Sequence, residues 1–248
     1  MSLFARLLGR QKPRWEEAWQ TYPGTVDNAS ALWSVDLGAV DAAPLTQLPV
    51  RMDVEAPYAA DADGLPADAG HLARMEDLVR QSVARLGGVY VGHLSGRGSC
   101  RFTGHLPSEP ASPVTLPGLA DARVRTEYDP HWAYVRDRLA PDERQHRLLS
   151  DRALVNVLSA QGDSLATPRA VAHVALFPEQ AAAESAAAAL QVDGFTVGVE
   201  RDDEGEFALT AMRTDPVAPP TVHELSWKVK ETVERHGGTY EGWTCAVA

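Results

Sequence analysis

The sequence predicts an α+β protein of two domains, and two observations lead to this prediction. The stretch GGxYxG occurs at residues 87–92 and again at 237–242. Each copy follows an amphipathic run and precedes an apolar one, which is typical of a helix that ends at glycine and a strand that follows directly. Of the 248 residues, 44% are hydrophobic, which is enough for one large or two small cores.

The second half shows a clear order of elements. Four runs read as strands, namely residues 169–177, 195–199, 207–211 and 239–247. Two runs read as helices, namely residues 179–190 and 221–236. The resulting order β-α-β-β-α-β predicts a ferredoxin-like domain, with a four-stranded antiparallel sheet and two helices on one face. A further helix is expected before it, roughly over residues 142–160.

The ends of the last helix carry specific signals. Pro219 and Pro220 block any extension upstream, and Thr221 and Glu224 have the spacing of a capping box. Gly237 follows the apolar stripe, so we expect it to end the helix with a positive φ, and we expect the same of Gly87 in the first copy. The motif residues with a predicted structural role are Gly87, Gly88, Tyr90, Gly237, Gly238, Tyr240 and Trp243.

The first half predicts a related α+β sandwich at residues 1–140, followed by the ferredoxin-like domain at 148–248. Strands are expected at residues 31–37, 48–54, 89–94, 99–106 and 122–128. No clear helix separates the first two. Helices are expected before Gly87, with an apolar stripe from Leu72 to Leu86, and over residues 130–139.

Charge and composition argue against several classes of function. The net charge of −11 argues against direct nucleic-acid binding, which needs clustered Lys and Arg. Residues 149–248 hold 7 of the 23 basic and 15 of the 34 acidic residues, a net charge of −8. No apolar run approaches the ~20 residues of a membrane span, and the basic residues 1–14 read as a tail, without a signal-peptide core. Cys100 and Cys245 read as packed thiols of a cytoplasmic protein, although a disulfide between them stays open.

No motif for catalysis, a cofactor or a metal is present, so we expect none of the three. Ser95 lies one position away from a nucleophile elbow and reads as a turn residue at a hairpin tip. Asp129 and His131 would suit base catalysis, but Asp129 reads more simply as a helix cap. The alternative to a non-catalytic protein is an enzymatic first domain with a cavity around Asp129, His131 or His93.

The second half contains the stretches ALVNVL, RAVAHVALF, DGFTV and GGTYEGW, the last at residues 237–243. These stretches, and GGTYEGW most specifically, resemble the RraB family, the regulators of ribonuclease E activity. The first half resembles a bacterial domain of unknown function, DUF695, in residues 15–22, SALWSVDL, the helix before GGVYVG, and DPHWAYVRDRLAP. The resemblance implies a regulator that binds a protein, with ribonuclease E as the partner that the family suggests, and it brings no catalytic residues. For the contact we predict the acidic turn formed by Asp202, Asp203, Glu204 and Glu206, because a basic RNA-binding surface would attract it.

Overall fold

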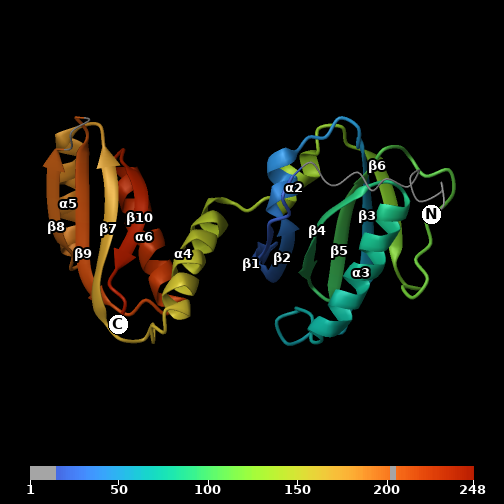
Figure 1. Ribbon diagram of the computed structural model, residues 1–248, viewed down its shortest axis with the longest axis horizontal. Helices are drawn as coiled ribbons and strands as arrows, with labels where there is room; N and C mark the ends of the chain where they lie inside the picture. The colour runs from blue at the N-terminus through green and yellow to red at the C-terminus, as the bar shows by residue number, and fades with distance from the viewer. Residues whose placement is uncertain (1–14, 202–204) are drawn as a thin grey trace, which may run out of the picture. The chain divides into compact units, whose positions relative to one another are not determined.

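The computed structural model describes residues 15–201 and 205–248. The chain divides into two compact units, one ending at Asp142 and one beginning at Glu143. Each combines an antiparallel sheet with helices, so the predicted α+β class is confirmed (Figure 1). Within the described residues, no helix is both long and apolar enough to cross a membrane.

The first unit is built on a six-stranded sheet in the order β1-β2-β4-β5-β3-β6. Its strands are β1 Trp19–Val26, β2 Ala29–Asp36, β3 Val50–Pro57, β4 Val89–Gly96, β5 Ser99–Leu106 and β6 Arg123–Tyr128. The helices are α2 Leu37–Ala42, α3 Ala69–Arg85 and the π-helical turn η1 Val135–Leu139. Helix α3 lies along one face of the sheet (Figure 1), where Met75, Val79 and Val83 are buried against β3 and β5.

The first unit differs from the sequence predictions at three places. Strand β1 was not predicted; it contains Pro23, and an edge strand tolerates a proline that a central strand would exclude. Helix α2 was also missed; Asp36 ends β2 and caps this helix by accepting a hydrogen bond from the Gly38 N–H. The helix expected over residues 130–139 begins later, because Trp132 has a φ of +53°.

Trp132 and the π-helical turn η1 cover part of the sheet face opposite α3. Trp132 is fully buried, and its Nε1–H donates to the carbonyl of Leu48. Trp33 of β2 donates to the carbonyl of Arg138, and the hydroxyl of Tyr22 donates to that of Leu139. These contacts join Trp132 and η1 to β1, to β2 and to Leu48, which lies just before β3.

The second unit has the predicted ferredoxin-like order. Its elements are α4 Glu143–Ala160, β7 Arg169–Phe177, α5 Gln180–Val192, β8 Thr196–Arg201, β9 Phe207–Asp215, α6 Thr221–Arg235 and β10 Thr239–Cys245. The sheet order β10-β7-β9-β8 is antiparallel throughout. Helices α5 and α6 pack on one face, as predicted, around Phe177, Leu190 and Val233.

One detail of the second unit differs from the prediction. Thr221 is the first residue of α6, and the N-cap is Pro220, which has no side chain to accept a hydrogen bond. The capping box of Thr221 and Glu224 is therefore absent. The carboxylate of Glu224 instead accepts from Arg144 of α4 at 2.8 Å, so the start of α6 is tied to the preceding helix.

Candidate functional site

The repeated motif builds the same helix end in both units. Gly87 has a φ of +74° and Gly237 a φ of +82°, as expected for left-handed residues after a helix. The second glycine of each pair is required because the surrounding atoms leave no room for a side chain. A Cβ at Gly88 would lie 2.4 Å from the carbonyl oxygen of His105, and a Cβ at Gly238 would lie 2.4 Å from Cε1 of Phe177. Each pair therefore combines a backbone requirement with a close approach.

The tyrosine of each motif meets a buried histidine. The hydroxyl of Tyr90 lies 3.2 Å from Nδ1 of His93, and that of Tyr240 lies 2.7 Å from Nδ1 of His173. Both strands carry an irregularity of register after the tyrosine. Burial lowers the pKa of each histidine to about 4 and raises the pKa of each phenol. These pairs are neutral and enclosed, so they act in packing.

Asp151 of α4 forms a buried network that was not predicted from the sequence. Its carboxylate accepts from Trp243 Nε1 and Arg147 Nε at 2.9 Å, from Ser226 Oγ at 2.5 Å, and lies 3.1 Å from Nδ1 of His223. Asp151 is only 2% exposed, so four donors compensate a charge that burial would otherwise penalise. Trp243 therefore does more than mark the motif, because it joins β10 to α4.

The predicted acidic contact site falls mostly outside the described residues. Asp202, Asp203 and Glu204 are not described, whereas Glu206 is half-buried. The flanking hairpin is present, since Arg201 of β8 pairs with Phe207 of β9.

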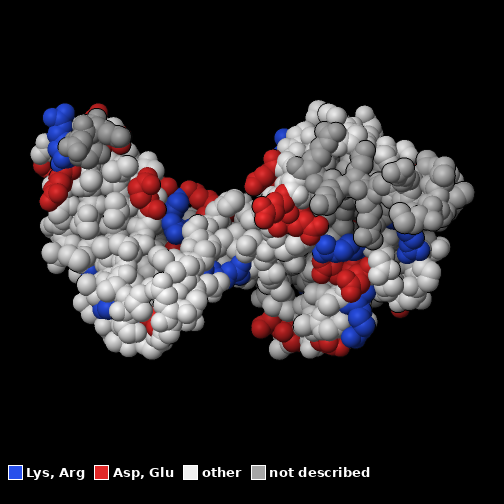
Figure 2. All heavy atoms as spheres, in the orientation of Figure 1, with Lys and Arg blue, Asp and Glu red and all other residues white. Residues whose placement is uncertain are grey.

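Strand register shows which other acids share this end of the sheet. Phe177 pairs with Phe207, and Leu176 pairs with Thr239, so the ends of β7 and the start of β10 lie there too. Glu179, Glu200 and Glu241 lie next to these positions and are exposed. Figure 2 shows carboxylates around this end of the second unit. We call Glu179, Glu200, Glu206 and Glu241 the acidic end.

The candidates for catalysis do not form a site. Asp129 accepts from the backbone N–H groups of Ala133 and Tyr134, which is the predicted capping role. His131 is exposed and His93 is buried on the α3 side of the sheet. Ser95 lies inside β4, fully buried, and donates to Sγ of Cys100, so its assignment to the turn was wrong. Among the described residues, no group of His, Cys, Asp and Glu could hold a metal ion.

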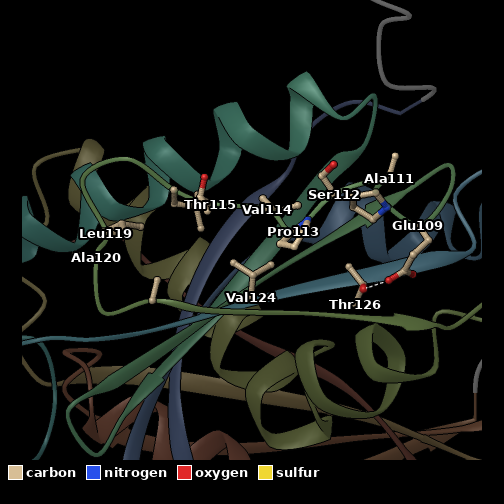
Figure 3. Close-up of a pocket in the computed structure, with 13 residues that line it drawn as sticks. Glu109, Ala111, Ser112, Pro113, Val114, Thr115, Leu119, Ala120, Val124 and Thr126 are labelled. Atoms are coloured by element: carbon tan, nitrogen blue, oxygen red, sulfur yellow. Dashed lines mark hydrogen bonds between the residues drawn. The ribbon is translucent and has the colours of Figure 1, made fainter.

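Two hollows border strand β6 of the first unit. The larger, about 640 Å³, lies between β6 and the loop of residues 109–122 (Figure 3). The smaller, about 210 Å³, is lined by charged side chains of β3, β5 and β6. Neither is lined by Asp129, His131 or His93, so these hollows do not support the enzymatic alternative.

Comparison with protein families agrees with this division into two units. Residues 150–245 match the family described as regulator of ribonuclease activity B, RraB. Residues 17–139 match DUF695, a family of unknown function. A search of curated proteins found no match to the chain. The chain therefore consists of a DUF695-family domain followed by an RraB-family domain.

Proposed function

We propose that the protein is a non-catalytic regulator that binds a ribonuclease, with ribonuclease E as the specific partner. The observation that carries the proposal is the RraB-family domain at residues 150–245. In this domain the buried carboxylate of Asp151 accepts hydrogen bonds from neighbouring donors. The buried side chains of Tyr240 and His173 form a hydrogen bond with each other. We therefore assign binding of the partner to residues on the surface of this domain.

The charge of the second unit suggests how such a surface works. Residues 149–248 carry a net charge of −8, and Glu179, Glu200 and Glu241 of the acidic end are exposed. A surface of this sign attracts a basic surface that would otherwise hold RNA, and it accelerates the encounter more than it strengthens the final complex. Binding there would exclude RNA by occupying its site. The proposal assigns the protein to the cytoplasm, with Cys100 and Cys245 as the free thiols that the structure contains.

The direct test mixes the full-length protein with purified ribonuclease E of the same host and follows both complex formation and RNA cleavage. We expect a complex and slower cleavage. Binding without any effect on cleavage would remove the regulatory part of the proposal. No complex at low salt would remove ribonuclease E as the partner, and affinity capture from host lysate would then identify another.

A charge variant tests the mechanism. Replacing Asp202, Asp203, Glu204 and Glu206 with Asn or Gln should slow association at low salt and flatten its salt dependence, because the Debye length falls from ~10 Å at 0.1 M to ~3 Å at 1 M. The matched control removes four exposed acids of the first unit, namely Asp41, Asp77, Asp121 and Asp137. If both variants slow association equally, only net charge acts and these four acids have no specific role. If neither does, electrostatic steering is excluded.

A further inference from the structure

The outer edge of strand β6 offers unpaired backbone groups. Within the described residues, β6 pairs only with β3 and stands at the end of the sheet order. The Asp129 N–H donates to the carbonyl of Pro49 at 2.8 Å, directly beyond the paired residues Tyr128 and Val50. Hydrogen-bonded pairs alternate along an antiparallel ladder, so every second residue back from Asp129 also bonds to β3. The backbone groups of Val124, Thr126 and Tyr128 therefore face outward, where the described residues provide no backbone partner.

The residues that alternate with Val124 and Thr126 give this edge a positive charge, because two of them are arginines. Arg123 and Arg125 lie on the sheet face opposite α3, beside Glu55 and Asp53 of β3. Those two acids are already engaged, Asp53 with Arg51 at 2.9 Å and Glu55 with Arg101 at 3.5 Å.

Arg123 and Arg125 are consequently left exposed, and within the described residues no ion pair to either is found. They stand two positions apart on the same face of an edge strand, in a chain of net charge −11. Two uncompensated guanidinium groups at this spacing match carboxylates at alternate positions of a neighbouring strand.

The hollows described above lie on the two sides of this edge. The charged hollow of about 210 Å³ includes Arg123 and Arg125. The hollow of about 640 Å³ is on the other face, where Val124 points toward Pro113 and Val114 of the loop (Figure 3). Tyr128 ends that side of the strand and is 72% exposed.

We propose that the outer edge of β6 binds an extended acidic peptide of a partner protein as a seventh strand. Its backbone would pair with Val124 and Thr126, its acidic side chains would contact Arg123 and Arg125, and the small apolar side chains between them would enter the loop-side hollow. The inference rests on the first unit alone, so it is independent of the proposed ribonuclease contact. Nucleic acid fits less well, because Glu127 and the two acids of β3 share this face and a phosphate chain cannot pair with the strand edge.

The probe is a fluorescent peptide with blocked ends in which Glu and Val alternate, added to the full-length protein and followed by anisotropy. We expect saturable binding that is lost when Glu is replaced with Lys or when the backbone amides are N-methylated. The double variant Arg123→Gln, Arg125→Gln should bind at least about tenfold more weakly, the effect of ~1.4 kcal/mol. The matched control is Arg136→Gln, Arg138→Gln, which removes two exposed arginines with the same spacing elsewhere in the unit.

A second pair of variants separates strand addition from simple charge attraction. Thr126→Pro removes one outward N–H without removing a bond to β3, whereas Thr126→Val removes the hydroxyl and keeps the N–H. The proline variant should bind about tenfold more weakly than the valine variant. If both bind alike, or the N-methylated peptide binds as well as the parent, the site takes only an anion and strand addition is wrong; because the N-methylated peptide is tested on the wild-type protein, this holds even if the proline variant fails to fold.

Three further results would also overturn the proposal: no peptide binding, equal losses for both arginine variants, or competition by single-stranded RNA at comparable concentration. Light scattering of the protein without peptide tests whether a second copy of the chain occupies the edge of β6. A dimer that Thr126→Pro dissociates would assign the edge to a second copy of this chain instead.

Discussion

Replacing Gly238 with alanine should destabilise the second unit more than the same change at Gly237, although the two glycines are neighbours. At Gly237 the added Cβ would meet nothing within 4 Å, so the cost is the left-handed backbone at φ +82°, about 1 kcal/mol. At Gly238 the Cβ would lie 2.4 Å from Cε1 and 2.5 Å from Cζ of Phe177. Carbon atoms pack at about 3.5–4 Å, so the ring would have to move by more than ~1 Å.

Phe177 has no room for that movement. The ring is fully buried in the cluster formed by β7, α5 and α6, and overpacking of such a core costs typically ~1–3 kcal/mol. We place Gly238→Ala toward the upper end of that range, because a central core ring blocks the Cβ. The smaller side chain of Phe177→Leu should relieve the clash, so the double variant should lose at least ~1 kcal/mol less than the sum of the single losses.

The assay is urea unfolding of the full-length protein, followed by amide hydrogen exchange in β7 and β10 so that the signal belongs to the second unit. Gly237→Ala combined with Phe177→Leu is the control, and its two effects should add within ~0.5 kcal/mol. Equal losses at Gly237 and Gly238, or additivity in both double variants, would show that the close approach to Phe177 does not determine the choice of glycine.

Two further predictions concern buried polar groups. Burial lowers the pKa of His105 to about 4 from its ordinary 6.5. The unfolded chain therefore takes up a proton at this residue at a higher pH than the folded protein does. The free energy of unfolding is at its full value above pH 6.5 and decreases as the pH falls toward 4. His105→Asn should therefore flatten the pH dependence of unfolding in this window by up to about 3 kcal/mol, measured by urea titration from pH 7 to pH 4; parallel curves would contradict this. Asp151→Asn presents an amide N–H to groups that are themselves donors, so we expect a loss of ~3–5 kcal/mol and a shifted Nε1–H resonance of Trp243 by NMR. The control is Asp193→Asn at ~0–1 kcal/mol, because the Asp193 side chain is 29% exposed and pairs with Lys228 near the surface. An unshifted resonance in Asp151→Asn would show that the indole does not donate to this carboxylate.

Periodicity was sufficient to predict the second unit. Its helices bury regular apolar stripes. Along its strands buried and less buried residues alternate, because only one face of the sheet is covered. The spacing of apolar residues therefore distinguishes the helices from the strands. The order of those elements then leaves few ways to pack them. The helix stops at Gly87 and Gly237 were predictable for a similar reason, since a positive φ after a helix strongly favours glycine.

Features that depend on distant partners were not predictable. Nothing around Asp151 in the sequence marks it as an acceptor for Trp243, which lies 92 positions later. The proline in β1 argues against a strand until the position of β1 at the sheet edge is known. The free arginines of β6 likewise depend on register, because Arg123 and Arg125 would be ordinary ion-pair partners if Asp53 and Glu55 were not already engaged.

The two copies of GGxYxG show how much a shared motif implies about function. Both end a helix, admit a close approach at the second glycine and place a tyrosine against a histidine. Yet one copy stands in a six-stranded sheet and the other in a four-stranded sheet of different order. The motif therefore joins a helix to the strand beneath it in both units, with its tyrosine buried and its first glycine exposed. The contacts proposed above use features that the two units do not share, namely the acidic end of the second unit and the arginine-bearing strand edge of the first.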